Sequence, residues 1–254
     1  MKKITLLACL VTAVSGTAYA EAPTRLATGS ISVDANKPYR LEADVGYSRT
    51  TTKNEASKST KDNLAAHVLF QRQVGVWGQE VRASAISSHD DKSTDNTEQY
   101  YLSGKLLHRS SNTVYQFAQL TGEKDSSSAF DYQAAALAGI GFDIIKTQQQ
   151  SLTAEVGAGV RHSKDRFAPK DTHNEAIGSV AAFYEYQINP MVRFNQDLGY
   201  EFGDKSRTLR SRTALSADLT KNFAAVASYN LKDVRADAGD SRTSLTSFGV
   251  RYKY

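Results

Sequence analysis

Apolar and polar side chains alternate at every second position along most of this chain. In the segment LTAEVGAGVR, residues 152–161, Leu152 and Val156 fall on one face, whereas Glu155 and Arg161 fall on the other. A β-strand sorts successive side chains onto opposite faces, but a helix would scatter the same residues around its axis. The alternation therefore predicts an all-β fold.

Twelve segments show this alternation, and each has about 9–14 residues, near the length that a tilted strand needs to cross a bilayer. After the first twenty residues no run of about 18 apolar residues occurs, so the sequence predicts no transmembrane helix. The predicted strands are residues 40–49, 62–72, 77–88, 97–109, 114–122, 132–144, 151–163, 175–188, 192–202, 208–219, 223–232 and 243–254.

The connections between these segments alternate between long and short. The long connection at residues 50–61 is followed by a short one at 73–76, and the same order recurs in a long one at 164–174 and a short one at 189–191. Outer-membrane barrels have short turns on the periplasmic side and longer loops outside. We therefore expect a 12-stranded antiparallel transmembrane β-barrel of the outer-membrane type over residues 40–254, with both of its ends on the periplasmic side.

Aromatic residues fall near both ends of the predicted strands. Two aromatic girdles that bound an aliphatic band are typical of the two membrane interfaces, although aromatic residues also favour strands in general. The residues expected near the short turns are Phe70, Trp77, Tyr115, Phe142, Tyr186, Phe194, Phe223, Tyr252 and Tyr254, and those expected near the long loops are Tyr47, Tyr100, Tyr200, Phe202 and Tyr229.

Residues 1–20 have the features of a secretory signal peptide. A short basic start is followed by an apolar run and by the small-x-small sequence Ala18-Tyr19-Ala20, which predicts cleavage after Ala20. The single cysteine of the chain would leave with this signal. Residues 21–39 are then expected to form a periplasmic segment before the barrel.

The chain ends on the alternating sequence SFGVRYKY, residues 247–254. This last strand is expected to pair with the first one, because an unpaired strand edge is not tolerated in hydrocarbon. The segment resembles the C-terminal signature of outer-membrane barrels, in which phenylalanine is the more usual final residue. The resemblance implies recognition by the barrel-assembly machinery through Ser247, Gly249, Tyr252 and Tyr254.

A resemblance to a known family rests on seven segments of the chain. These segments are WGQEV, YYLSGKLLHR, FDYQAAALAGIGF, LTAEVGAGVRHS, NEAIGSVAAFYEYQI, FNQDLGYEFG and TSLTSFGVRYKY. Through them the chain, over about residues 40–254, resembles the family of salt-induced outer membrane proteins, which is classed as a domain of unknown function. The first hairpin, SRTTTKNEASKST, departs from the GNT-like element of that family, which puts any role of this loop in doubt. The resemblance implies an outer-membrane barrel and expression under salt stress, and it brings no activity with it.

The polar faces of the predicted strands carry charges of both signs and would line the lumen. These charges could line a narrow water-filled passage for small solutes or ions, or they could pair across strands and close the lumen. Twelve strands lie between side-chain-filled barrels of about eight strands and open porins of about 16–18, so size does not decide. The predicted lumen-lining residues are Glu155, Arg161, Arg193, Asp197, Glu201, Arg210, Arg212, Asp218 and Arg251.

The leading hypothesis is a narrow small-solute pore or a structural envelope protein in the outer membrane of a Gram-negative bacterium. Such a protein would contact outer-membrane lipid and lipopolysaccharide, and it would need neither a cofactor nor a catalytic site. The net charge of +4 does not indicate nucleic-acid binding, because basic and acidic residues are interleaved throughout the chain.

A surface hydrolase is the alternative hypothesis. The predicted outer loops contain His89 with Asp90 and Asp91, and His173 with Asp171. A carboxylate beside a histidine could activate a water molecule for hydrolysis. Ordinary polar loop composition accounts for the same residues.

Overall fold

The computed structural model describes residues 38–54, 57–88, 97–126, 128–167, 170–237 and 239–254. The predicted signal peptide, with Ala18 and Ala20, lies outside the described residues, and so does nearly all of the predicted periplasmic segment.

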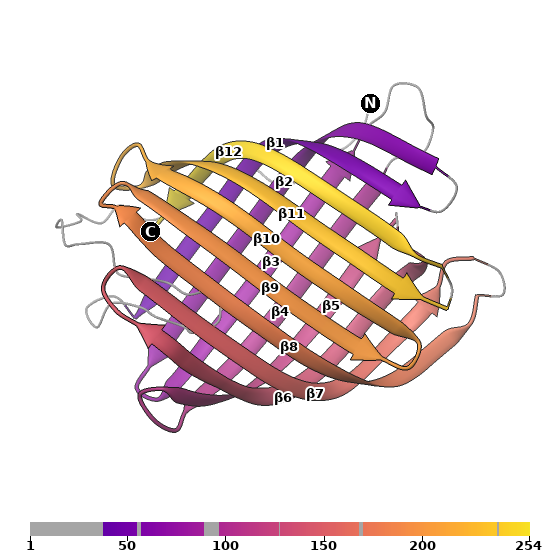
Figure 1. Ribbon diagram of the computed structural model, residues 1–254, viewed down its shortest axis with the longest axis horizontal. Helices are drawn as coiled ribbons and strands as arrows, with labels where there is room; N and C mark the ends of the chain where they lie inside the picture. Colours follow the sequence, from indigo (N-terminus) through magenta and orange to yellow (C-terminus); the bar gives the residue numbers. More distant parts are fainter. Residues whose placement is uncertain (1–37, 55–56, 89–96, 127, 168–169, 238) are drawn as a thin grey trace.

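Twelve antiparallel strands form one closed barrel (Figure 1). Each strand pairs with the next, and β12 pairs with β1 to close the ring, which confirms the predicted fold. The described residues include no helix with the length and apolar character needed to cross a membrane. The strands are β1 Tyr39–Asn54, β2 Ser57–Val74, β3 Trp77–Ser88, β4 Thr97–Arg109, β5 Val114–Asp125, β6 Phe130–Lys146, β7 Gln150–Asp165, β8 Thr172–Asn189, β9 Val192–Gly203, β10 Ser206–Asp218, β11 Phe223–Ala236 and β12 Ser241–Lys253.

The first and the last strand place both ends of the barrel chain at one rim. Leu41 and Tyr254 exchange backbone hydrogen bonds of 3.2 and 3.0 Å, so the barrel begins and ends at the same rim. We call this end the turn-side rim and the opposite end the loop-side rim. The turn-side rim also carries the connections at residues 75–76, 110–113, 147–149, 190–191 and 219–222.

The prediction of a long loop at residues 50–61 is wrong. Strands β1 and β2 continue through it as a paired ladder that ends with Asn54 opposite Ser57. Three consecutive threonines at 50–52 favour a strand. A strand beyond the bilayer needs no apolar face, so the alternation of hydropathy stops before the strand does. By contrast, β3 and β4 have the predicted bounds.

The barrel carries apolar side chains on its outer surface and charged side chains inside. Val45, Leu120 and Phe248 are 52, 68 and 66% exposed, whereas Arg161 and Glu185 are each 2% exposed. Water-soluble domains have the reverse arrangement, because burying a charge in an ordinary core is costly. An outer surface of this kind fits the hydrocarbon of a bilayer.

The turn-side aromatic residues divide between the two faces of the barrel. Trp77 and Phe223 lie on the outer surface, as predicted, and are 50 and 46% exposed. Tyr115 is the exception, and its predicted place in the outer girdle is wrong. It is fully buried inside the barrel, where its hydroxyl donates to Glu155 at 2.6 Å. Its ring occupies the space beside Gly141, where an added Cβ would lie 2.1 Å from the ring.

Two glycines face each other at the seam between the first and the last strand. Gly46 and Gly249 are directly opposite in the register of β1 and β12. A Cβ on Gly249 would lie 2.4 Å from the carbonyl oxygen of Val45, so only glycine permits this backbone approach. Beside the seam, the hydroxyls of Ser247 and Ser228 are 2.7 Å apart in the interior.

A second pair of facing glycines lies between β6 and β7. Gly139 and Gly157 are directly opposite in register, and a Cβ on Gly139 would lie 2.2 Å from the carbonyl oxygen of Val156. The same Cβ would lie 2.7 Å from the ring of Phe117, which points inward from β5. The second glycine pair therefore makes room for close backbone contact and for an aromatic ring inside the barrel.

Candidate functional site

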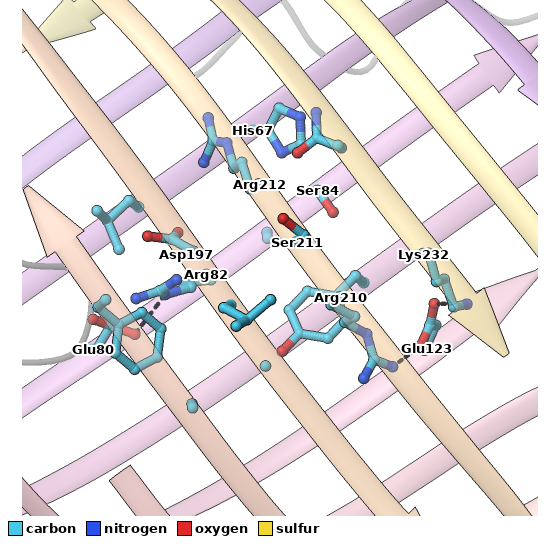
Figure 2. Close-up of a pocket in the computed structure, with 18 of the residues that line it drawn as sticks. His67, Glu80, Arg82, Ser84, Glu123, Asp197, Arg210, Ser211, Arg212 and Lys232 are labelled. Carbon is cyan, nitrogen blue, oxygen red and sulfur yellow. Dashed lines mark hydrogen bonds and ion pairs between the residues drawn. The ribbon is translucent and has the colours of Figure 1, made fainter. Parts of the chain in front are cut away.

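The lumen of the barrel contains a cavity of about 370 Å³ (Figure 2). Its charged lining is balanced, with seven basic and seven acidic residues among those described. The basic residues are Arg40, Arg82, Lys105, Arg210, Arg212, Lys232 and Arg251. The acidic residues are Glu42, Asp44, Glu80, Glu123, Glu155, Asp197 and Glu201.

An ion-pair network crosses the lumen on the side of the loop-side rim. Figure 2 shows the Glu123 carboxylate between Arg210 and Lys232. Glu123, on β5, pairs with Lys232, on β11, and lies 2.8 Å from Nη2 of Arg210, on β10. Lys232 Nζ is also 2.9 Å from Asp125 Oδ2. Because β5 and β11 are six strands apart in a ring of twelve, these side chains connect opposite walls.

The network continues along the wall through β9, β7 and β8. Arg210 Nη1 lies 3.1 Å from Glu201 Oε1, and the other carboxylate oxygen of Glu201 lies 3.4 Å from Arg161 Nη1. Arg161 also pairs with Glu175 at 2.9 Å and donates to the backbone and side-chain oxygens of Ser206 at 3.0 and 2.7 Å. Arg161, on β7, therefore contacts three further strands, β8, β9 and β10.

A second connection inside the barrel joins β4 and β7, which are three strands apart. Lys105 Nζ, on β4, lies 2.8 Å from both carboxylate oxygens of Glu155, on β7. Tyr115 donates to the same carboxylate, and the Lys105 ammonium lies 4.9 Å from the ring centroid of Phe117 and 5.5 Å from that of Phe183. The ammonium thus has a carboxylate partner and two aromatic faces, which together stabilise a buried cation.

A third group of ion pairs lies near the seam. Arg251 donates to both carboxylate oxygens of Asp44, at 2.6 and 2.9 Å, in the bidentate geometry that favours arginine. Its remaining Nη1 lies 3.4 Å from Glu42, which also pairs with Arg40. Arg212, on β10, reaches Asp44 at 3.3 Å. These contacts tie β12 to β1 and connect both strands with β10.

The structure brings most of the sequence-predicted lumen residues into the cavity, and it places the others toward the rims. Asp197 lines the cavity directly opposite Arg212 in register, but Arg161, Arg193 and Asp218 do not line it. Arg193 lies 3.5 Å from Glu185, and Asp218 lies 2.6 Å from Lys253. The residues that line the cavity are Glu155, Asp197, Glu201, Arg210, Arg212 and Arg251.

Sequence reasoning missed two residues that pair across the lumen, Glu123 and Lys232. Glu123 lies one residue beyond the predicted strand 114–122, although it continues the inward alternation of Gln119 and Thr121. Lys232 ends the predicted strand 223–232, and its position gave no sign of a partner on the far wall. The continued alternation was therefore the only available signal for Glu123.

The histidines of the hydrolase hypothesis are only partly described. His89, Asp90 and Asp91 lie outside the described residues. His173 Nε2 lies 2.8 Å from Asp165 Oδ2, so its carboxylate partner is Asp165 and not the predicted Asp171. Within the part of the chain that the structure describes, no three His, Cys, Asp or Glu residues could hold a metal ion.

Several solved outer-membrane barrels have a similar fold. The translocator domain of autotransporter NalP from Neisseria meningitidis has a TM-score of 0.50 and 9% identity, over 86% of this chain and 89% of its own. The COG4313 outer membrane channel from Pseudomonas putida F1 has a TM-score of 0.52 and 11% identity, over 85% of this chain and 96% of its own. The NanC porin has a TM-score of 0.51 and 9% identity, over 82% of this chain and 98% of its own. At these identities the likeness shows the fold alone.

Among curated proteins, none matches this chain in sequence. One family does match it, over residues 43–254, and its description is "Protein of unknown function, DUF481". Because the match covers most of the chain, this outer-membrane-type barrel is a member of the DUF481 family.

Proposed function

We propose that the protein is a narrow channel in the outer membrane of a Gram-negative bacterium, through which small polar solutes and ions pass. The observation that carries this proposal is the charge-balanced cavity of about 370 Å³ inside a barrel with an apolar outer surface. A polar lumen is what a water-filled passage requires, and an apolar exterior is what the bilayer requires.

The crossing ion pairs make the proposed passage narrow. Glu123 with Arg210 and Lys232, and Lys105 with Glu155, divide the lumen into smaller openings. The channel therefore suits single small solutes rather than folded or polymeric ones. Equal numbers of acids and bases in the lining favour weak selectivity between cations and anions.

A closed barrel that acts as a structural envelope protein is the second candidate. The same observation favours it, because ion pairs across a lumen can hold strands in register while they leave no continuous path. The two candidates differ in one measurable property, which is whether ions pass.

Single-channel conductance of the refolded chain, residues 21–254, in a planar bilayer tests the proposal. We expect small, discrete and reproducible current steps, with a reversal potential near zero in a salt gradient. A silent bilayer, with folding confirmed by heat-dependent migration in gel electrophoresis, would refute the channel and support the structural role.

Two further parts of the proposal need separate tests. We propose that the protein has no catalytic role, so an assay with peptide and ester substrates should give no activity that depends on His173. We also propose that expression rises with external salt, which transcript measurements at low and high osmolarity would check. A constant transcript level would remove the salt link without affecting the channel.

A further inference from the structure

Two arginines face each other on the outer surface near the loop-side rim. Arg207, on β10, and Arg235, on β11, are directly opposite in register. Their neighbours Ser206 and Val234 are buried inside the barrel, so alternation places the two arginines on the outer face. Like charges directly opposite each other destabilise a sheet, which makes this pair a position that would gain from an anion.

A third arginine extends the same patch onto β12. Arg242 is directly opposite Asp233 in register, and its side chain is 58% exposed. Asp233 is shared, because its carboxylate lies 3.6 Å from Arg235 and 4.0 Å from Arg242. Among the described residues, Arg207 makes no ion pair. The three arginines, on three neighbouring strands, thus have one carboxylate partner between them, Asp233, and it pairs with only two of them.

Two acidic residues between β11 and β12, Asp237 and Asp240, have partners other than the three arginines. Asp237 lies 3.5 Å from Lys205 of the neighbouring turn. The Asp240 carboxylate accepts a hydrogen bond from the backbone of Ala236 at 3.3 Å. Both acids follow the end of β11, so they lie farther from the membrane than the strand-borne arginines.

The arginines lie next to the outer aromatic girdle. Phe202, which is directly opposite Arg207 in register, is 45% exposed and stacks on Tyr200 with ring centroids 5.9 Å apart. Leu209 follows Arg207 on the same face of β10, two residues deeper. Aromatic girdles mark the membrane interface, so cations just beyond them stand at the level of lipid headgroups.

We propose that Arg207, Arg235 and Arg242 bind the phosphate groups of lipopolysaccharide in the outer leaflet. The guanidinium group matches phosphate geometry because it can donate two parallel hydrogen bonds. The acyl chains of the same lipid would lie on the apolar surface beneath, beside Leu209 and Phe202. The inference rests on the proposed outer-membrane location, but it is independent of whether the lumen conducts.

Lipopolysaccharide fits this patch better than free phosphate does. An inorganic phosphate at an exposed arginine must compete with water and salt without any apolar contact. A phosphorylated lipid brings its phosphate to the patch already anchored in the bilayer, which raises the local concentration of the anion.

The test uses the refolded chain in detergent micelles with purified, fully phosphorylated lipopolysaccharide. Lipid that stays with the protein after size-exclusion chromatography is measured by native mass spectrometry. The triple variant R207Q, R235Q and R242Q is compared with R72Q, because Arg72 is an exposed arginine at the turn-side end of β2. Dephosphorylated lipopolysaccharide and inorganic phosphate are tested in parallel.

We expect the triple variant to retain about one tenth or less of the phosphorylated lipid that the wild type retains, because it loses several charge-assisted hydrogen bonds. R72Q should retain the wild-type amount, and dephosphorylated lipid should bind weakly to all three proteins. Equal retention by the triple variant and the wild type would overturn the proposal. Equal binding of dephosphorylated lipid, or displacement of the lipid by inorganic phosphate at the same concentration, would overturn it too.

Folding is checked independently by heat-dependent gel migration. If the triple variant does not fold, the single variant R207Q replaces it, because Arg207 makes no ion pair that its loss would break. R207Q should then retain severalfold less lipid than R72Q, and equal retention by these two variants would refute the site.

Discussion

Glu123 and Lys232 form an ion pair although their strands, β5 and β11, stand on opposite sides of the ring. Contacts between neighbouring strands are the rule in a barrel, but this contact joins two walls that share no backbone hydrogen bond. Arg210 reaches the same carboxylate from β10. The width of the lumen on the loop side is therefore limited by side chains and not by the backbone.

Glu123→Gln should raise the single-channel conductance. The substitution removes the carboxylate that holds Arg210 across the lumen, so Arg210 can move toward Glu201 on the wall, while Lys232 keeps Asp125 as its partner. The expected change is an increase of about twofold or more, since Arg210 would no longer narrow the path of the ions. Bilayer recordings check it.

Glu98→Gln is the matched control for this prediction, because Glu98 is exposed near the start of β4. Its conductance should equal that of the wild type. A conductance of Glu123→Gln at or below the wild-type value would show that the crossing pair does not restrict the passage.

Neutralising Arg210 and Arg212 together should make the channel favour cations. The charged lining of the cavity would then hold five bases against seven acids, instead of seven against seven. Reversal potentials in a salt gradient should shift in the direction of cation permeation, and high salt should weaken the shift by screening. An unchanged reversal potential would place the path of the ions away from these residues.

Glu155→Gln should destabilise the barrel by about 3–5 kcal/mol, the usual cost of leaving one partner of a buried pair without its counter-charge. The Lys105 side chain is only 4% exposed and has Glu155 as its carboxylate partner. Unfolding by urea in lipid vesicles measures the change.

Tyr115→Phe tests the same cluster with a smaller change in structure. It removes the hydroxyl that donates to Glu155 but keeps the ring beside Gly141, so the expected cost is about 1 kcal/mol. If both substitutions cost the same, the ion pair with Lys105 contributes no more than the hydrogen bond does.

Gly249→Ala should lower the yield of folded barrel. The added Cβ would lie 2.4 Å from the carbonyl oxygen of Val45, across the seam that closes the ring. Gly199→Ala is the control, because Gly199 also faces the lumen and a Cβ there would meet nothing within 4 Å. Gel migration after refolding measures both yields, and equal yields would show that the seam tolerates a side chain.

The strands could be predicted from the sequence because the bilayer imposes a strict pattern on them. Each residue of a spanning segment faces either lipid or lumen, so β3 and β4 were predicted with the bounds that the structure shows. Outside the bilayer this requirement ends. The extension of β1 and β2 through residues 50–61 was missed for that reason.

The ion pairs of the lumen could be predicted only between neighbours. Arg210 and Glu201, on neighbouring strands, were both predicted to line the lumen, and they do pair. Its second partner, Glu123, depends on how close the opposite walls come, and alternation carries no information about that distance. Tyr115 was misplaced for a related reason. An aromatic residue near a strand end fits the membrane interface, and only the glycine opposite its ring shows that it fits the lumen.

The two pairs of facing glycines lie at opposite positions around the ring, one between β1 and β12 and the other between β6 and β7. Because glycine has no side chain, it allows a β-sheet to bend sharply, as at the corner of a barrel. Two opposite corners divide the cylinder into two facing panels, and the spacing between the panels then depends on how sharply each corner bends. The four glycines, two at each corner, would thereby govern whether Glu123 can reach the opposite wall.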